Sequence, residues 1–437
     1  MTTTSPVPAA RTWANSRLTV LGACLCLLLA LAACSGTRER VTIMVPWTQQ
    51  AEFQTFYSLV KDFEDDTGIE VDVQVTRALT QQLDAAVTAG APPDLAVLPS
   101  PAAVARYAGR SGGLRALDRH GDGGGDENIV DITDYLQPFQ GLSRVAGTAY
   151  AVPVKVDVKS LVWYDSRTTS APAAGAASAS GRGAGVPSGL PWCLGLESGP
   201  TSGWPGADWI ADVLLAGAGP DAYARWVSGD LPWTAGQVEQ AWQQWRGLVG
   251  AKVLDGAAQR GFAEATKDLA GASPDCRLAH GARSALATDV QQDTRLDFTA
   301  PAGRGPLQVS GDFVGMFTAH NAAAKSFVRY LAGQQAQQAW VNEKGAVALS
   351  AHKRVTRYDN AVQRRIAELL RPQARRPLCF SAADVLSPDV SAAFYRAVIE
   401  YVDQPDQLTH LMQSLQKVQA NLGGSALPRQ SVCTVPK

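Results

Sequence analysis

The feature that most constrains the fold of this chain is a regular alternation of strand and helix patterns near its N-terminus. Apolar residues recur at helical spacing from Phe53 to Phe63, and Gly68 follows as a stop signal. From Ile69 to Val75 they alternate with polar residues, as in a half-buried strand. The elements expected from such patterns lie at 41–45, 53–63, 69–75, 79–89 and 94–98. Their order, strand–helix–strand–helix–strand, predicts an α/β domain with a largely parallel sheet.

The length and composition allow large cores and argue against nucleic-acid binding. With 437 residues, the chain is long enough for two or three domains. It is 46% hydrophobic and 18% charged, so it is not disordered as a whole. Lys and Arg number 39 against 40 Asp and Glu, a net charge of −1, which leaves no basic excess to hold a phosphate backbone.

The N-terminus resembles the export signal of a bacterial lipoprotein. Arg11 and Arg17 precede an uncharged apolar run that is shorter than the ~20 residues of a membrane-spanning helix. The run ends in LAAC at 31–34, which is similar to a lipobox. We therefore expect a lipoprotein signal peptide over 1–33, lipid on Cys34 and a location at the outer face of the cytoplasmic membrane. An ordinary cleaved signal and an uncleaved anchor are the alternatives.

The cysteines are consistent with export. Of the seven, two leave with the signal peptide and one carries the lipid, so four remain in an oxidising compartment. Four cysteines allow three pairings. We favour Cys193–Cys276 and Cys379–Cys433, because each pair stays within one stretch of chain. The mature chain lacks the close ligand spacing of a zinc site, so neither a metal nor a cofactor is expected.

The chain beyond residue 150 changes character several times. Residues 166–191 form a low-complexity run that cannot build a core and predicts a loop. Tryptophan-rich helices follow, one of them introduced by a capping box from Thr234 to Gln237. Trp242 and Trp245 fall on its apolar face and are expected to be structural. Strands are expected at 295–299 and 307–314, a helix at 322–340, and further helices over 360–437.

Short segments in a fixed order resemble the extracellular solute-binding proteins of ABC importers, the family that carries sugars and oligosaccharides. They are AVPVK at 151–155, KSLVWYD at 159–165, PWCLGLESG at 191–199, SGWPGADWI at 202–210, PDCRL at 274–278, GDF at 311–313, YLA at 330–332 and GAVALS at 345–350. The resemblance rests on their order, covers about 41–437, and is nearest to α-glucoside-binding lipoproteins.

This resemblance implies an α/β fold of the periplasmic-binding-protein type (type II), with two α/β lobes joined by hinge strands and ligand held between them. By analogy, lobe one comprises 41–152 and 308–344, and lobe two comprises 153–307 and 345–437. The resemblance also implies a monomer that binds a carbohydrate and delivers it to membrane permease subunits with a cytoplasmic ATPase. Two features depart from the family pattern. The 166–191 run replaces a helix, and Gln49-Gln50 stand where relatives have glycine and an acid.

Candidate ligand-binding residues follow from the chemistry of sugars and from the strand ends. Ligands in open parallel sheets lie beyond the carboxyl ends of strands. Sugars offer apolar faces to aromatic rings, and hydroxyls to carboxylates, amides and lysines. The candidates are Trp47, Thr48, Gln49, Lys155, Trp204, Asp208 and Asp312. The competing interpretations are core packing for Trp47, a helix cap for Asp208 and a hinge salt bridge for Lys155.

Catalytic motifs are weak throughout the sequence. GRSGG at 109–113 matches G-x-S-x-G, but a glycine-rich loop follows where a nucleophile elbow needs a helix. The five histidines are scattered, and the acids around His120 lack the spacing of an EF-hand. We therefore expect a binding protein and not an enzyme. The alternatives are a surface glycan-active enzyme that uses Glu197 and Asp208, and a receptor for a polyamine or a peptide.

Overall fold

The computed structural model describes residues 1–2, 39–47, 49–118, 128–173, 191–271, 275–422, 427 and 429–436. The predicted signal peptide, Cys34, Thr48 and most of the 166–191 run lie outside these residues. Across the described ranges, no helix has the length and apolar character needed to cross a membrane. Within the same ranges, no cluster of His, Cys, Asp or Glu side chains could hold a metal ion.

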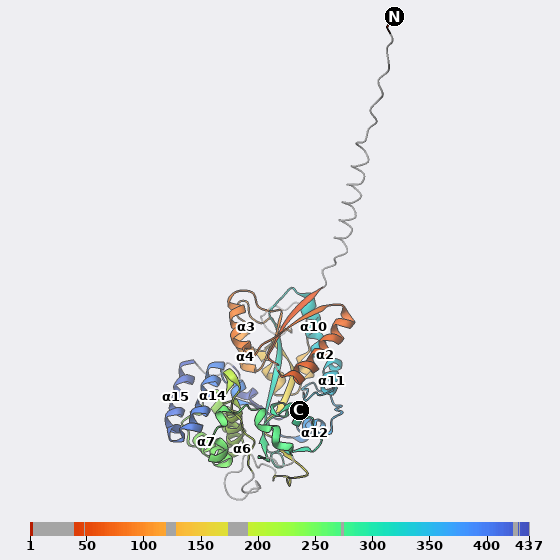
Figure 1. Ribbon diagram of the computed structural model, residues 1–437. Helices are drawn as coiled ribbons and strands as arrows, with labels where there is room; N and C mark the ends of the chain where they lie inside the picture. The colour runs from red at the N-terminus through yellow and green to blue at the C-terminus, as the bar shows by residue number, and fades with distance from the viewer. Residues whose placement is uncertain are drawn as a thin grey trace.

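The chain folds into two α/β lobes, which Figure 1 shows one above the other. The strands are β1 (Arg40–Val45), β2 (Glu70–Val75), β3 (Leu95–Leu98), β4 (Arg144–Val145), β5 (Thr148–Ala149), β6 (Ala151–Val158), β7 (Val162–Asp165), β8 (Ala279–His280), β9 (Leu296–Thr299), β10 (Leu307–Met316), β11 (Leu378–Phe380) and β12 (Cys433–Thr434). The α-helices are α2 (Gln50–Thr67), α3 (Leu79–Thr88), α4 (Pro101–Tyr107), α5 (Phe139–Leu142), α6 (Trp204–Ser228), α7 (Gly236–Val249), α8 (Ala251–Leu254), α9 (Thr288–Gln291), α10 (Ala322–Ala332), α11 (Gln334–Asn342), α12 (Ala361–Leu369), α13 (Ala382–Val385), α14 (Pro388–Asp403) and α15 (Leu408–Leu422). Helices α2, α3, α4 and α10 lie in the upper lobe, and α6, α7, α14 and α15 gather in the lower one (Figure 1).

The order of strands and helices predicted near the N-terminus is confirmed in the upper lobe. Strand β1 is central and pairs in parallel with both β2 and β3, so Ile43 lies beside Val73 and Leu95. Helix α2 buries its apolar stripe, including Phe56 and Phe63, against this sheet. The helix ends where expected, because Gly68 adopts the left-handed conformation with a φ of 71°.

Two long antiparallel strands, β6 and β10, connect the lobes. The last residues of β10 pair with β3, with Phe313 opposite Leu98, whereas its first residues pair with β11, with Leu307 opposite Leu378. The register between β6 and β10 shifts between Asp312 and Phe313, a β-bulge at the crossing. The chain therefore passes between the lobes along paired backbone. The exact lobe boundaries proposed from the sequence stay a prediction.

The lower lobe combines a small sheet, of order β8-β7-β9, with a helical layer. Its core is rich in tryptophan: Trp242 and Trp245 are fully buried and pack against Tyr401 of α14. Their expected structural role is thus confirmed. Both favoured disulfides are formed, Cys193–Cys276 and Cys379–Cys433.

Three local expectations differ from the structure. The helix expected over 322–340 is broken at Gly333, whose extended backbone separates α10 from α11. Helix α7 begins at Gly236 with Ala235 in the N-cap position, so the motif that begins at Thr234 is not a capping box. The C-terminal region contains β11 and β12 as well as helices. These strands have three and two residues, too few to show an alternating pattern in the sequence.

Candidate functional site

The candidate site is built on one face of β6, where it crosses between the lobes. Side chains two residues apart in a strand share a face, so Lys155, Asp157 and Lys159 form a row at the end of β6. Asp312 of β10 lies directly opposite Lys155 in the ladder. Four charged groups are therefore placed at the crossing by backbone pairing alone.

Lys155 is the centre of the first group of charges, the Lys155 cluster, which also contains Glu52, Asp157 and Asp312. Its Nζ is ion-paired with Glu52 and lies 3.5 Å from Asp157 Oδ2 and 3.7 Å from Asp312 Oδ2. The Lys155 side chain is only 8% exposed. Burial alone would lower the pKa of Lys155, but the three carboxylates outweigh it and raise that pKa. Burial raises the pKa of both Glu52 and Asp157, against the pull of the ammonium group.

Lys159 organises the second group, the Lys159 cluster, with Asp208 of α6 and Asp384 of α13. Its Nζ lies 2.8 Å from Asp208 Oδ2 and 3.2 Å from Asp384 Oδ2. Ser381 Oγ donates a 2.8 Å hydrogen bond to Asp208 Oδ1. Burial raises the pKa of Asp384 to about 6, and the charge of Asp312 in the other cluster adds to this shift. The two clusters are thus within electrostatic reach of one another.

Aromatic side chains border the Lys159 cluster. Trp204, the first residue of α6, is half-buried and meets Phe262 edge-on, with ring centres 5.2 Å apart. Lys159 Nζ lies 5.9 Å from the centre of the Trp204 ring, within the range of a cation–π contact. Burial raises the pKa of Tyr395 on α14, and the carboxylates of Asp384 and Asp208 add to the shift, so this phenol is near the same charges.

A glycine fixes the position of Trp204. Gly203 has a φ of 104°, and a Cβ built on it would lie 2.1 Å from the carbonyl oxygen of Tyr395. Only glycine allows the start of α6 to approach α14 so closely. Pro205 follows in the first turn of the helix, where its missing N–H costs no hydrogen bond. The sequence GWP thereby holds the indole beside the Lys159 cluster.

The structure brings three of the predicted residues into the two clusters and a fourth, Trp204, against one of them. The three are Lys155, Asp208 and Asp312. The salt bridge considered for Lys155 is present, whereas Asp208 lies beyond the first turn of α6 and caps nothing, since Gly203 is the N-cap. Whether any of these residues contacts a ligand stays a prediction.

The three predicted residues after β1 have different surroundings. Trp47 is 3% exposed, packs against Phe56 and Trp340, and donates from Nε1 to Asp312 Oδ2 at 2.8 Å. It therefore combines the core position considered for it with a contact to the Lys155 cluster. Gln49 is the N-cap residue of α2 and makes no side-chain cap. Thr48 lies outside the described residues.

The candidates named from the sequence lack five members of this site, namely Asp157 and Lys159, which follow Lys155 in the chain, and three residues of other elements. Glu52 lies in the first turn of α2, Asp384 on the short α13, and Tyr395 on α14. No spacing relates them to β6, because they are brought together only by the tertiary fold. Asp157 and Lys159 could have been found, since residues two and four positions along an extended chain share the face of Lys155.

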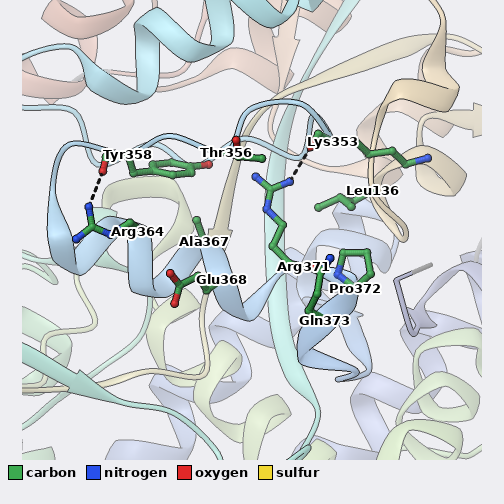
Figure 2. A pocket seen from close by; sticks show the side chains of 10 residues that line it. All are labelled: Leu136, Lys353, Thr356, Tyr358, Arg364, Ala367, Glu368, Arg371, Pro372 and Gln373. Carbon is green, nitrogen blue, oxygen red and sulfur yellow. Dashed lines mark hydrogen bonds between the residues drawn. The ribbon is translucent and has the colours of Figure 1, made fainter.

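Cavities in the described residues are small at this site and larger elsewhere. A space of about 10 Å³ lies beside Glu52, Lys155 and Trp340. A cavity of about 440 Å³ lies around α12, outside both clusters (Figure 2). The space beside the Lys155 cluster is therefore small, and the charged groups of both clusters are paired to one another.

Two lobes joined by crossing strands, with polar groups gathered at the crossing, define a binding protein of the periplasmic type. Residues 58–355 match the family of bacterial extracellular solute-binding proteins, and the chain belongs to this family. It is 28% identical to an osmoprotective compounds-binding protein of Synechocystis sp., over 87% of this chain and 94% of that one. It is 26% identical to an α-glucosides-binding periplasmic protein of Rhizobium meliloti, over 83% of each chain.

A solved structure confirms the fold. A bacterial solute receptor described as exclusively preferring β-D-galactopyranose has a TM-score of 0.70 and 20% identity, over 88% of this chain and 99% of that one. The type II fold expected from the sequence is thus confirmed.

Family membership also settles two broader expectations. The family consists of extracellular binding proteins, so export is confirmed and the chain is not an enzyme. The glycan-active alternative is accordingly wrong. Its two acids have other partners: Glu197 accepts from the backbone N–H of Gly199, and Asp208 pairs with Lys159.

Proposed function

We propose that this protein is the sugar receptor of an ABC importer, and that it holds its ligand between the lobes, over the Lys155 and Lys159 clusters. The observation that carries the proposal is the joining of five carboxylates, two lysines and the half-exposed Trp204 at the strand crossing. Carboxylates accept hydrogen bonds from sugar hydroxyls, ammonium groups donate to them, and an indole face covers the apolar side of a sugar ring.

The relatives support a sugar of the α-glucoside class. One is described as binding α-glucosides, and the fold-related receptor as binding a hexose, galactopyranose. The relative described as binding osmoprotective compounds extends the range of polar solutes to be tested. Five carboxylates against two lysines leave the site acidic, so a polyamine is the alternative ligand that the titration must test.

Binding on this proposal requires the lobes to separate and close again. The space beside Lys155 is about 10 Å³, which is too small for a sugar ring, so ligand enters an opened form. Closure then presents a surface of both lobes to the permease subunits. The lipid proposed on Cys34 would keep a monomeric receptor next to them at the outer face of the membrane.

Ligand titration tests the proposal directly. We expect maltose, trehalose or a longer glucoside to change the tryptophan fluorescence of the purified protein in a saturable manner. Trp204→Ala should weaken binding about tenfold or more, because stacking on the half-exposed indole is lost. Tyr330→Ala is the matched control, a half-buried aromatic of α10 that belongs to neither cluster.

Two outcomes would overturn the proposal. One is saturation by spermidine or a peptide with no response to any sugar, including galactose. The other is equal weakening of sugar binding by the Trp204 and Tyr330 variants.

A further inference from the structure

A second charged region lies outside the candidate site, on the segment that contains α12. Residues 353–376 contain eight cationic side chains and two acidic ones, in a chain whose net charge is −1. The cations are Lys353, Arg354, Arg357, Arg364, Arg365, Arg371, Arg375 and Arg376, and the acids are Asp359 and Glu368. Such a concentration of one sign creates a local field that attracts anions.

This segment encloses the cavity of about 440 Å³, which we name the basic pocket. Its apolar floor is formed by Leu136, Ala367 and Pro372. Figure 2 shows Arg371 near the middle of the pocket, with Arg364 towards one end and Lys353 towards the other. The hydroxyl groups of Thr356 and Tyr358 add hydrogen-bonding capacity along the upper side.

The cations of the basic pocket are held by neutral groups. Lys353 Nζ donates to the carbonyl of Thr133 at 2.8 Å, and Arg364 to that of Tyr358 at 3.3 Å. Arg371 donates to the carbonyls of Lys353 and Val355. A carbonyl satisfies an N–H group but does not neutralise its charge, so the positive field persists.

Neighbouring cations outside the pocket differ in this respect. Arg354 is paired with Asp134 at 3.1 Å, and Arg365 with Asp297 at 2.7 Å. Within the pocket, Glu368 is the one acidic lining residue among those described, and Asp131 acts on Lys353 only from a distance. The lining therefore carries three positive charges against one negative charge.

We propose that the basic pocket is a second binding site, for an elongated anion that carries phosphate groups. Guanidinium and ammonium donors bind phosphate oxygens through charge-assisted hydrogen bonds, and Arg371 is placed to contact the middle of such a ligand. The spread of the three cations along the pocket suits several linked anionic groups better than one. The ligand has two potential sources, a soluble polyphosphate compound or the headgroup of an anionic lipid.

Calorimetric titration of the purified protein at low salt tests this site. The probes are tripolyphosphate and tetrahexanoyl cardiolipin, a short-chain lipid with two linked phosphates, used below its micelle concentration. We expect Lys353→Gln/Arg364→Gln to weaken binding of at least one probe about tenfold or more. Each of the two side chains is exposed and holds only one backbone carbonyl, so the fold should persist. Arg396→Gln/Lys417→Gln removes two exposed charges from α14 and α15 and is the matched control.

The outcomes separate the sources and the proposals. Binding of tripolyphosphate alone identifies a soluble phosphate compound, and binding of the short lipid alone identifies a headgroup. Absence of binding by both probes, or equal weakening by both double variants, overturns the basic pocket as a site. Sugar binding by the Lys353/Arg364 variant should stay within twofold of the parent. Absence of phosphate binding would therefore not contradict the sugar-receptor proposal.

Discussion

Asp384 shows how burial and pairing oppose each other at a single residue. Burial raises the pKa of its carboxyl from 3.8 to about 6, even though Lys159 Nζ lies 3.2 Å away. An acid whose pKa is higher in the folded than in the unfolded state stabilises the fold while it is protonated. That contribution is complete below the unfolded pKa and is lost as the pH rises through the folded pKa. Ionised Asp384 therefore costs stability at neutral pH, a pattern that is common at functional sites.

The effect predicts a pH-dependent result for Asp384→Asn. Between about pH 4 and pH 7 the parent should lose about 2 kcal/mol that the variant does not, because asparagine does not titrate. The free energy of unfolding of the variant, relative to the parent, should therefore increase across this window. Urea unfolding followed by circular dichroism at both pH values measures it, with the exposed Asp359→Asn as control. If the free energy of unfolding of Asp384→Asn relative to the parent were the same at both pH values, the raised pKa of Asp384 would be contradicted.

At the scale of elements, the contact between α6 and α14 depends on a close backbone approach. Gly203 adopts a left-handed φ directly against the carbonyl of Tyr395, and this contact sets where α6 begins. A change at this position must move one helix relative to the other. Trp204 at the start of α6 and Tyr395 in the middle of α14 would move with them.

Substitution of two glycines of this region should have opposite effects. Gly203→Ala should destabilise the protein by about 2–4 kcal/mol, because the methyl group meets backbone at 2.1 Å and the φ is unfavourable. Gly217→Ala, within α6 and with nothing within 4 Å of the added methyl, should stabilise by about 0.5–1 kcal/mol. Thermal and urea unfolding measure both changes. Similar small effects for the two variants would show that the approach of the helices is not constrained.

The elements also show which parts of the fold the sequence could predict. Helix α2 and strand β2 were predictable because their apolar residues repeat over several turns or several pleats. Strand β11 was not, because its three residues are held by pairing with β10 and β12 and not by a local pattern. The residues of the site also differ in how far the sequence could predict them. Lys155 and Asp312 follow from the crossing strands, whereas Glu52 reaches the site only through the packing of α2.

At the scale of the whole molecule, both disulfides lie in the part of the chain assigned to the lower lobe. Cys379–Cys433 joins β11 to β12 at the edge of the large sheet, across 54 residues. Cys193–Cys276 closes a longer loop of 83 residues. The upper lobe has no such cross-link among its described residues, so non-covalent contacts, ion pairs such as Arg106–Asp84 included, hold it together.

Removal of the shorter cross-link should therefore reduce stability strongly. For Cys379→Ser/Cys433→Ser we expect a loss of about 4 kcal/mol in the free energy of unfolding, because a loop of 54 residues gains freedom in the unfolded chain. Urea unfolding of the oxidised protein and of the double variant measures the loss. An unchanged unfolding midpoint would show that pairing of β11 with β10 is sufficient.

The position of β10 also has a consequence for biosynthesis. This strand lies next to β3 in the sheet, yet it is made more than 200 residues later in the chain. At ~5–20 residues per second, a ribosome needs on the order of 10–40 s to reach it. During that interval the nascent polypeptide lacks the strand that pairs with β3, which disfavours early folding of a chain that is to be exported.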